Sequence, residues 1–466
     1  MQDSTNQHDA TAPEVQAFID KGNEAAQEGD YETAAEAFEH AIETDPSHAR
    51  ARYNLALAQQ NLGDLEGAVA TYLRSIQLDH NLIEAYINLG HLYGELGLDE
   101  ESLEVFQRAI ELDAGNDDLF VALGDTCRDI GFYEDAIQAY RQAEILNPQN
   151  AQAQDNLADV RERVNAQAQR IGELEHHLDA DPSDPERYAE VIGAYLEARR
   201  YQDAETKTEM MMQLFPDDPG VYETMALVQE AMGDIDQVVN AWERVTQIDP
   251  DDMDAWEHLG SWRVEQGLLD EAVAAYRKAI ELDPESPSAR FNLAEVLLEL
   301  GQFDESITLY QALSVGKFAG ISAGDLKTDA YLGLAEVYNA AGRYDEALQI
   351  SEKLLDEYPD DSMGLFQKAS ALDALGRHED AIGAYIASLE NDPLNADTYN
   401  DLADTYLKVG DIVNAVEMAE MAISLAPEMD VAYETLAQAL RAAGRADEAA
   451  EADRQAAALR AADEAE

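Results

Sequence analysis

The sequence predicts an all-α fold in which one short helical hairpin is repeated along the chain. The stretch Met253–Ser286 shows this hairpin most clearly. Leu259 follows Trp256 at helical spacing, so one face of a first helix is apolar. Gly267 permits the left-handed conformation that ends a helix, and after a second apolar face Pro284 stops the second helix. Neither helix can bury its apolar face alone, so the hairpins must stack into a solenoid.

A 34-residue frame fixes the number of hairpins. A glycine stands at position 15 of this frame in eleven of thirteen repeats and a proline at position 32 in nine, which is too regular for chance. The repeats begin at Val15, Ala49, Ile83, Asp117, Ala151, Pro185, Pro219, Met253, Pro287, Thr328, Ser362, Ala396 and Asp430. The predicted parts are a disordered polar arm (1–14), repeats 1–9 (15–320), an insertion (321–327), repeats 10–13 (328–463) and a tail (464–466).

The repeat resembles the tetratricopeptide repeat (TPR). The signature residues of that family match Trp256 at position 4, Leu259 and Gly260 at 7 and 8, Tyr276 at 24 and Pro284 at 32. The resemblance implies an α-α superhelical TPR solenoid of about 13 helical hairpins. It also implies a right-handed superhelix whose concave surface is lined by the first helix of each repeat, helix A.

Two places depart from the repeat pattern. Repeat 5 (151–184) is degenerate, with Asn165 where glycine belongs and Arg170 in place of a small residue at position 20. Either its hairpin survives, with Asn165 in the left-handed conformation, or its two helices fuse; the unbroken 34-residue register favours the hairpin. The second departure is 314–327, which contains three glycines and two lysines and is predicted to be a loop or distorted turn.

The charge balance limits the partners. The formal net charge is −67, from 97 acidic and 30 basic residues. Nucleic acids and anionic membranes are polyanions, so neither is expected as a partner. The composition resembles that of halophile proteins, in which molar salt screens self-repulsion beyond about 3 Å. A dedicated acidic binding surface is the alternative.

The remaining sequence signals are mostly absences. Cys127, at position 11 of its repeat, has no second cysteine to pair with and is expected to be a buried structural thiol. No apolar run reaches the roughly 18 residues of a membrane span, and the N-terminus lacks the features of a signal peptide. No catalytic constellation, phosphate loop or calcium loop is present. We expect a cytoplasmic protein that is not an enzyme and holds no cofactor or metal.

The predicted binding surface is the concave groove. In the TPR family, helix A positions 2, 5, 6, 9, 12 and 13 face the concave side. Asparagines at position 6 resemble the arrays with which some TPR superhelices hold the backbone of an extended peptide, because an amide both donates and accepts. The alternative is that asparagine is merely tolerated on an exposed helix face. The predicted peptide-binding residues are Asn23, Arg50, Tyr53, Asn54, Asn88, His91, Asp125, Asn156 and Asn292.

The groove is not expected to bind the acidic tail of a chaperone. The carboxylate clamp of chaperone-binding TPR proteins needs lysines, but Ile19 and Glu84 occupy the corresponding positions in repeats 1 and 3. Beyond repeat 3 the predicted groove is strongly acidic, through Asp118, Asp125, Asp129, Asp155 and Asp159.

These features predict a non-enzymatic protein–protein interaction scaffold that holds a peptide segment or a partner helix in its concave groove. Two alternatives remain. The solenoid could associate with itself to form a structural assembly platform, or the chain could be the regulatory subunit of a separately encoded enzyme.

The acidic composition makes stability depend on salt. Self-repulsion acts over a Debye length of about 30 Å at 0.01 M salt and only about 3 Å at 1 M. We expect circular dichroism to show a large fall in melting temperature, or a loss of helix, when KCl is removed. A melting temperature that is indifferent to KCl would contradict the interpretation as a halophilic protein.

Overall fold

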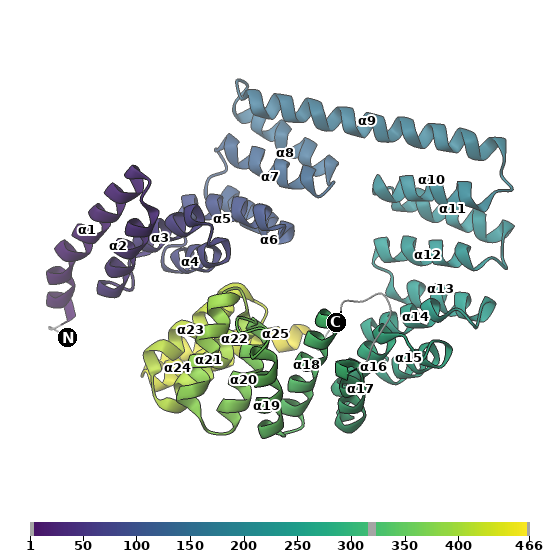
Figure 1. Cartoon of the computed structure of the whole chain (residues 1–466). Coiled ribbons are helices and arrows are strands. Elements are labelled where there is room, and N and C mark those ends of the chain that lie inside the picture. The colour runs from purple at the N-terminus through teal and green to yellow at the C-terminus, as the bar shows by residue number, and fades with distance from the viewer. Residues whose placement is uncertain (1–3, 316–322, 464–466) are drawn as a thin grey trace. The chain divides into compact units, whose positions relative to one another are not determined.

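The 34-residue frame becomes a series of helices. The computed structural model describes residues 4–315 and 323–463, which hold 25 helices and no strand. These helices fall into two compact units. We call Met1–Arg161 together with Asp360–Glu466 the split unit, and Glu162–Pro359 the middle unit. Each has the all-α architecture of a TPR solenoid, in which consecutive helices pack as antiparallel pairs (Figure 1).

The split unit contains two runs of helices. The first run is α1 (Ser4–Glu28), α2 (Tyr31–Thr44), α3 (Ala49–Leu62), α4 (Leu65–Leu78), α5 (Ile83–Leu96), α6 (Asp99–Leu112), α7 (Asp117–Asp129) and α8 (Tyr133–Leu146). The second is α20 (Ser362–Ala374), α21 (His378–Asn391), α22 (Ala396–Val409), α23 (Ile412–Leu425), α24 (Asp430–Ala442) and α25 (Ala446–Asp463).

The middle unit contains repeats 6–9 and most of repeat 10. Its helices are α10 (Pro185–Glu197), α11 (Tyr201–Leu214), α12 (Pro219–Met232), α13 (Ile235–Ile248), α14 (Met253–Glu265), α15 (Leu269–Leu282), α16 (Pro287–Glu299), α17 (Phe303–Val315), α18 (Ala323–Ala340) and α19 (Tyr344–Leu355). The boundary between the two units falls inside α9 (Ala151–Ala180).

In eight of the thirteen repeats the second helix carries an aromatic ring at position 24 and the first helix a small residue at position 8. The ring at position 24 of the second helix covers position 8 of the first. A Cβ atom added to Gly260 would lie 2.7 Å from the Tyr276 ring, and one added to Gly90 would lie 2.8 Å from Phe106. Both rings are buried. The absence of a side chain at position 8 therefore sets how closely the helices approach.

Position 15 ends the first helix as the sequence predicts. All eleven glycines at this position have a left-handed backbone, with φ between 69° and 87°. In repeat 6 the position is Arg199, which also adopts a positive φ of 54°. A left-handed conformation costs a non-glycine residue roughly 1–2 kcal/mol, so packing of the hairpin outweighs this cost.

The signature residue at position 4 reaches back to the preceding repeat. The Trp256 indole N–H donates to the carbonyl of Pro250 at 3.0 Å, and the Tyr222 hydroxyl donates to the carbonyl of Pro216 at 3.1 Å. In both cases the acceptor is the proline at position 32, where the preceding helix has ended. Position 4 therefore satisfies a backbone group at the junction between repeats.

Many acidic residues cap helices. The Asp64 carboxylate accepts the backbone N–H of Gly67, and the Asp234 carboxylate accepts that of Gln237, each at 3.1 Å. A negative charge at a helix N-terminus is also favoured by the helix dipole. Part of the excess acid therefore stabilises the fold locally.

The preference for a surviving hairpin in repeat 5 is wrong. Residues 151–180 form one continuous helix, α9 (Figure 1), which is 30 residues long and has Asn165 in its interior. The reason lies at position 20, where a small residue lets the two helices approach. In repeat 6 this residue is the fully buried Ala204, but in repeat 5 it is the exposed Arg170, which pairs with Glu197.

Two other boundaries differ from the prediction. Helix α1 begins at Ser4, so most of the arm predicted to be disordered (1–14) is helical. A polar composition disfavours burial, but it does not prevent a helix from extending N-terminally from the apolar face that starts at Val15. Likewise, both ends of the predicted loop are helical, because residues 314–315 belong to α17 and residues 323–327 belong to α18. Residues 316–322, which hold the rest of that loop and part of the insertion, lie outside the described residues, as does the tail.

No helix in the described ranges has the length and apolar character needed to cross a membrane.

The ring contact at position 8 can be tested with a matched pair of glycines. Gly260→Ala places a methyl group against the buried Tyr276 ring, and overpacking of this kind costs about 1–3 kcal/mol. Gly383→Ala in α21 meets no atom within 4 Å and gains helix propensity, so it should raise stability by about 0.5–1 kcal/mol. Denaturant unfolding in high salt measures both variants. Equal effects would show that the ring contact does not limit helix approach.

Candidate peptide-binding groove

The asparagines at position 6 bond to the preceding repeat. The Asn54 amide Nδ2 donates to Asn23 Oδ1 at 3.1 Å, and Asn88 Nδ2 donates to the Tyr53 hydroxyl at 3.1 Å. All four side chains are half-buried. Each amide is therefore held in a fixed direction by the repeat before it, while its carbonyl oxygen and second N–H are not needed for that bond.

Repeats 4 and 5 continue the pattern. Asn156 Nδ2 donates to Asp125 Oδ1 at 2.7 Å, which joins α9 to α7. The same oxygen accepts the Tyr140 hydroxyl at 2.7 Å and the Arg128 guanidinium at 2.9 Å. Gln152 reaches the other carboxylate oxygen at 3.4 Å. Asp125 is thus the centre of a network, and Arg128 offsets its charge.

A cation and an imidazole lie beside the first asparagines. Arg50 bonds Glu84 of the next repeat through both terminal nitrogens at 3.2 Å, and its guanidinium lies 4.9 Å from the centre of the Tyr53 ring. The His91 ring meets the Phe106 ring edge-on at 5.1 Å. Partial burial of the imidazole lowers the pKa of His91, and the nearby Asp125 carboxylate opposes this shift. The side chains of Arg50 and His91 both remain partly exposed to solvent.

The structure brings together most of the predicted site residues. Eight of the nine predicted residues belong to the split unit: Asn23, Arg50, Tyr53, Asn54, Asn88, His91, Asp125 and Asn156. Seven of them take part in the bonds between repeats described above. His91 instead interacts with Asp125 through charge. Asn292 belongs to the middle unit, where its amide bonds the Tyr276 hydroxyl. Like the other amides at position 6, it contacts the preceding repeat, but its partner stands at position 24.

Sequence reasoning missed Tyr140 and Arg128, which also bond Asp125. They lie at a signature position (24) and a concave position (12), but a position in the repeat does not say which aspartate a side chain contacts. Asp401 was also missed, although it occupies position 6 in repeat 12, on α22, and following that position through every repeat would have found it. Burial, reinforced by Asp397 and Asp404, raises the pKa of Asp401 to about 6, while a bond from Asn400 opposes the shift.

Cys127 is buried, as its register predicts. Burial, with a contribution from Asp135, raises the pKa of the thiol to about 11, so the thiol stays protonated near neutral pH. It lines a pocket of about 570 Å³ between α6, α7 and α8. A protonated thiol is a poor nucleophile, which agrees with a packing role.

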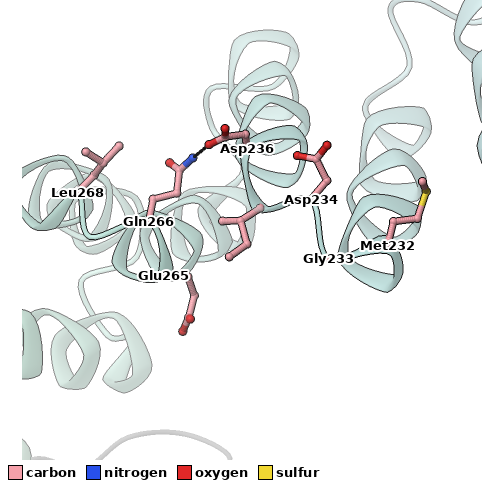
Figure 2. A pocket seen from close by; sticks show the side chains of 8 residues that line it. Met232, Gly233, Asp234, Asp236, Glu265, Gln266 and Leu268 are labelled. Carbon is pink, nitrogen blue, oxygen red and sulfur yellow. Dashed lines mark hydrogen bonds between the residues drawn. The ribbon is translucent and has the colours of Figure 1, made fainter. Parts of the chain in front are cut away.

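The middle unit has a pocket of about 710 Å³ at the turns of repeats 7 and 8 (Figure 2). Asp234 and Asp236 contribute carboxylates from the start of the α13 hairpin, and Gln266 donates to Asp236 at 2.6 Å. Because Asp234 caps α13 and Asp236 is already bonded, these groups have structural partners. Within the ranges that the structure describes, no three His, Cys, Asp or Glu side chains are grouped so that they could hold a metal ion.

Comparison with known proteins identifies the class. Profiles described as tetratricopeptide repeat, or TPR repeat, match residues 19–81, 83–116, 124–164, 261–301, 285–356 and 384–417. These matches cover more than half of the chain, so it belongs to the TPR family. No match is found among curated proteins.

The chain is also similar to several solved structures. The "APC/C hetero-tetramer Cut9-Hcn1" is 13% identical with a TM-score of 0.39, over 91% of this chain and 96% of that one. Yeast Tom70 is 17% identical with a TM-score of 0.39, over 93% and 96%. A thermophilic TPR protein in Thermus thermophilus is 20% identical with a TM-score of 0.36, over 41% and 100%. At these values the similarities do not identify a partner.

The raised pKa of Asp401 predicts a pH dependence. The pKa is about 6 in the folded chain and about 3.9 in the unfolded chain, so the folded chain binds more protons between these values. Protonated Asp401 thus contributes fully to the free energy of unfolding below about pH 4, and this contribution is lost as the pH rises through 6. Asp401→Asn should therefore exceed the wild type in stability, by a margin that widens by about 1 kcal/mol between pH 5 and 7.

The control for this experiment is Glu390→Gln on α21, an exposed carboxylate. Chemical denaturation at each pH, at constant high salt, measures the difference from the wild type. If the stability difference between Asp401→Asn and the wild type changed no more between pH 5 and 7 than that of Glu390→Gln, the pKa of Asp401 would not be raised.

Proposed function

We propose that the chain is a non-enzymatic protein–protein interaction scaffold that holds an extended peptide or a partner helix in the groove of repeats 1–5. The observation that carries this proposal is the pair Asn54 and Asn88 at position 6 of consecutive repeats. Each amide is oriented by a bond to the repeat before it, and each keeps hydrogen-bonding capacity. Oriented amides at the repeat spacing suit a peptide backbone, which offers a donor and an acceptor at every residue.

The surroundings favour a ligand of mixed character. Arg50 and Tyr53 add a cation and an aromatic hydroxyl near the first amides, whereas beyond them the exposed Asp118, Asp129 and Asp155 add negative charge. A bound segment would present backbone groups or an acid to repeats 2 and 3 and basic side chains to repeats 4 and 5. We also propose that the overall acidity is an adaptation to high salt. Binding must therefore be measured at high salt concentration.

The test uses a displayed library of short peptides, selected on the full chain in 2 M KCl, followed by affinity measurement on the selected peptides. Asn54→Ala with Asn88→Ala removes two backbone-binding amides. Affinity should fall by about 1–3 kcal/mol in total, or roughly 5- to 150-fold, because each hydrogen bond contributes about 0.5–1.5 kcal/mol.

The matched control is Asn391→Ala on α21. Its amide also makes one intramolecular bond, to the carbonyl of Ala387 at 2.8 Å, but it lies outside the groove. The double variant loses the bonds to Asn23 and Tyr53, so its folding is checked by circular dichroism. Full affinity in a folded double variant would place the binding surface elsewhere.

A further inference from the structure

Two arginines of repeat 2 are buried against the acidic helix of repeat 12. Both repeats belong to the split unit, in which α4 packs against α23. The Arg74 guanidinium lies 2.6 Å from the Glu420 carboxylate, and the Arg52 guanidinium lies 3.5 Å from that of Glu417. These pairs join residues that are about 350 positions apart in the chain.

These contacts differ from the surface ion pairs of the chain. Both arginine side chains are only 13% exposed, whereas Arg108, in an ordinary pair with Glu111 one turn away, is 53% exposed. The Nε atoms of Arg52 and Arg74 are buried without a hydrogen-bond partner. A chain with so few basic residues thus places two of them where burial is costly, and that cost is offset only if acidic groups face them.

The rest of the contact is complementary as well. Gln77 on α4 accepts from Arg74 at 2.7 Å and donates to the backbone carbonyl of Glu420 at 2.6 Å. Leu394, from the turn before α22, packs against the apolar cluster that includes Tyr72 and Leu89. The surface of repeat 2 therefore contacts a backbone carbonyl, an apolar side chain and two carboxylates that lie one helical turn apart.

From this geometry we infer that Arg52, Arg74 and Gln77 form a docking site for an acidic helix, and that α23 of the same chain occupies it as a reversible clasp. The occupant is fixed by charge complementarity, since Glu417 and Glu420 stand three residues apart on α23 and each meets one arginine. Closure joins the two sequence-distant parts of the split unit, 1–161 and 360–466. This inference does not depend on the proposed peptide groove.

Salt should close the clasp. The chain as a whole carries a charge of −67, so its two distant segments repel each other over a long range when salt is low. A half-buried pair in contact is screened much less than that long-range repulsion. High salt therefore removes the repulsion and retains the contact, and dilution opens the clasp.

The experiment measures the distance between spin labels at Leu62→Cys on α3 and Val413→Cys on α23, in a full-length Cys127→Ala chain at 2 M KCl. Both label positions are exposed, at 47% and 78%. The unmodified clasp should give one narrow distance. Arg52→Glu with Arg74→Glu should reduce the closed population at least about tenfold and give a longer, broad distribution, because both attractions become repulsions.

Reversal of the partners supplies the decisive control. Adding Glu417→Arg and Glu420→Arg to the double variant should restore the narrow distance, whereas Arg108→Glu should leave it unchanged. Circular dichroism confirms that each variant is helical, so that an unfolded variant is not taken for an open one. A narrow distance that survives Arg52→Glu with Arg74→Glu would overturn the proposal, as would a wild-type distance that is already broad at 2 M KCl.

Chains that carry a single label test the occupant. A mixture of Leu62→Cys and Val413→Cys chains should give no short distance if α23 docks within its own chain. A short distance in the mixture, together with a dimer by light scattering, would overturn the assignment to the same chain and make a second copy the occupant.

Discussion

The architecture depends on close approach of the two helices in a repeat, and in eight of the thirteen repeats an aromatic ring at position 24 packs toward a small residue at position 8. This contact fixes the distance between the two helices of a repeat, and through that distance the faces that remain for the next repeat. Tyr276 over Gly260 and Phe106 over Gly90 show the contact complete. In repeat 5 the exposed Arg170 stands at position 20, where every other repeat has alanine, serine or valine, so the two helices cannot approach closely there. The chain continues as one helix, whose second half packs onto Tyr188 and Val191 of repeat 6.

Charge is the second constraint, and the fold deals with it locally. Aspartates such as Asp64 and Asp234 stand at helix N-termini, where backbone N–H groups and the helix dipole stabilise them. Others, such as Asp125, accept several donors at once. Many of the remaining acids are exposed, and salt must screen them. In such a chain a buried cation is unusual. The burial of Arg52 and Arg74 against glutamates therefore indicates a specific contact.

The sequence could predict whatever is repeated. A glycine or proline that recurs every 34 residues identifies the turns, so the hairpins and the position of Asn54 and Asn88 on the first helix follow from counting, whereas the TPR class came from the resemblance of the repeat to that family. It could not predict that Asn88 turns toward Tyr53, because an amide rotamer depends on its neighbours across the repeat boundary. Nor could it predict that Glu420 meets Arg74. Pairs of glutamates one turn apart occur throughout so acidic a chain, and a single sequence does not say which of them is close in space.

The cross-repeat bonds also bear on what the proposed groove can recognise. Asn54, Asn88 and Asn156 each use an amide N–H in a bond to the preceding repeat, and Asn88 also bonds Tyr72, so less of their donor capacity than of their acceptor capacity is left. The neighbouring aspartates only accept hydrogen bonds when ionised. The capacity left in the groove is therefore weighted toward acceptors, and a ligand that satisfies it must be rich in donors. An extended segment with free backbone N–H groups and basic side chains meets that need. A partner helix does so less well, because its backbone N–H groups are already used within the helix, except at its N-terminus. On these grounds the extended segment is the better of the two proposed ligands.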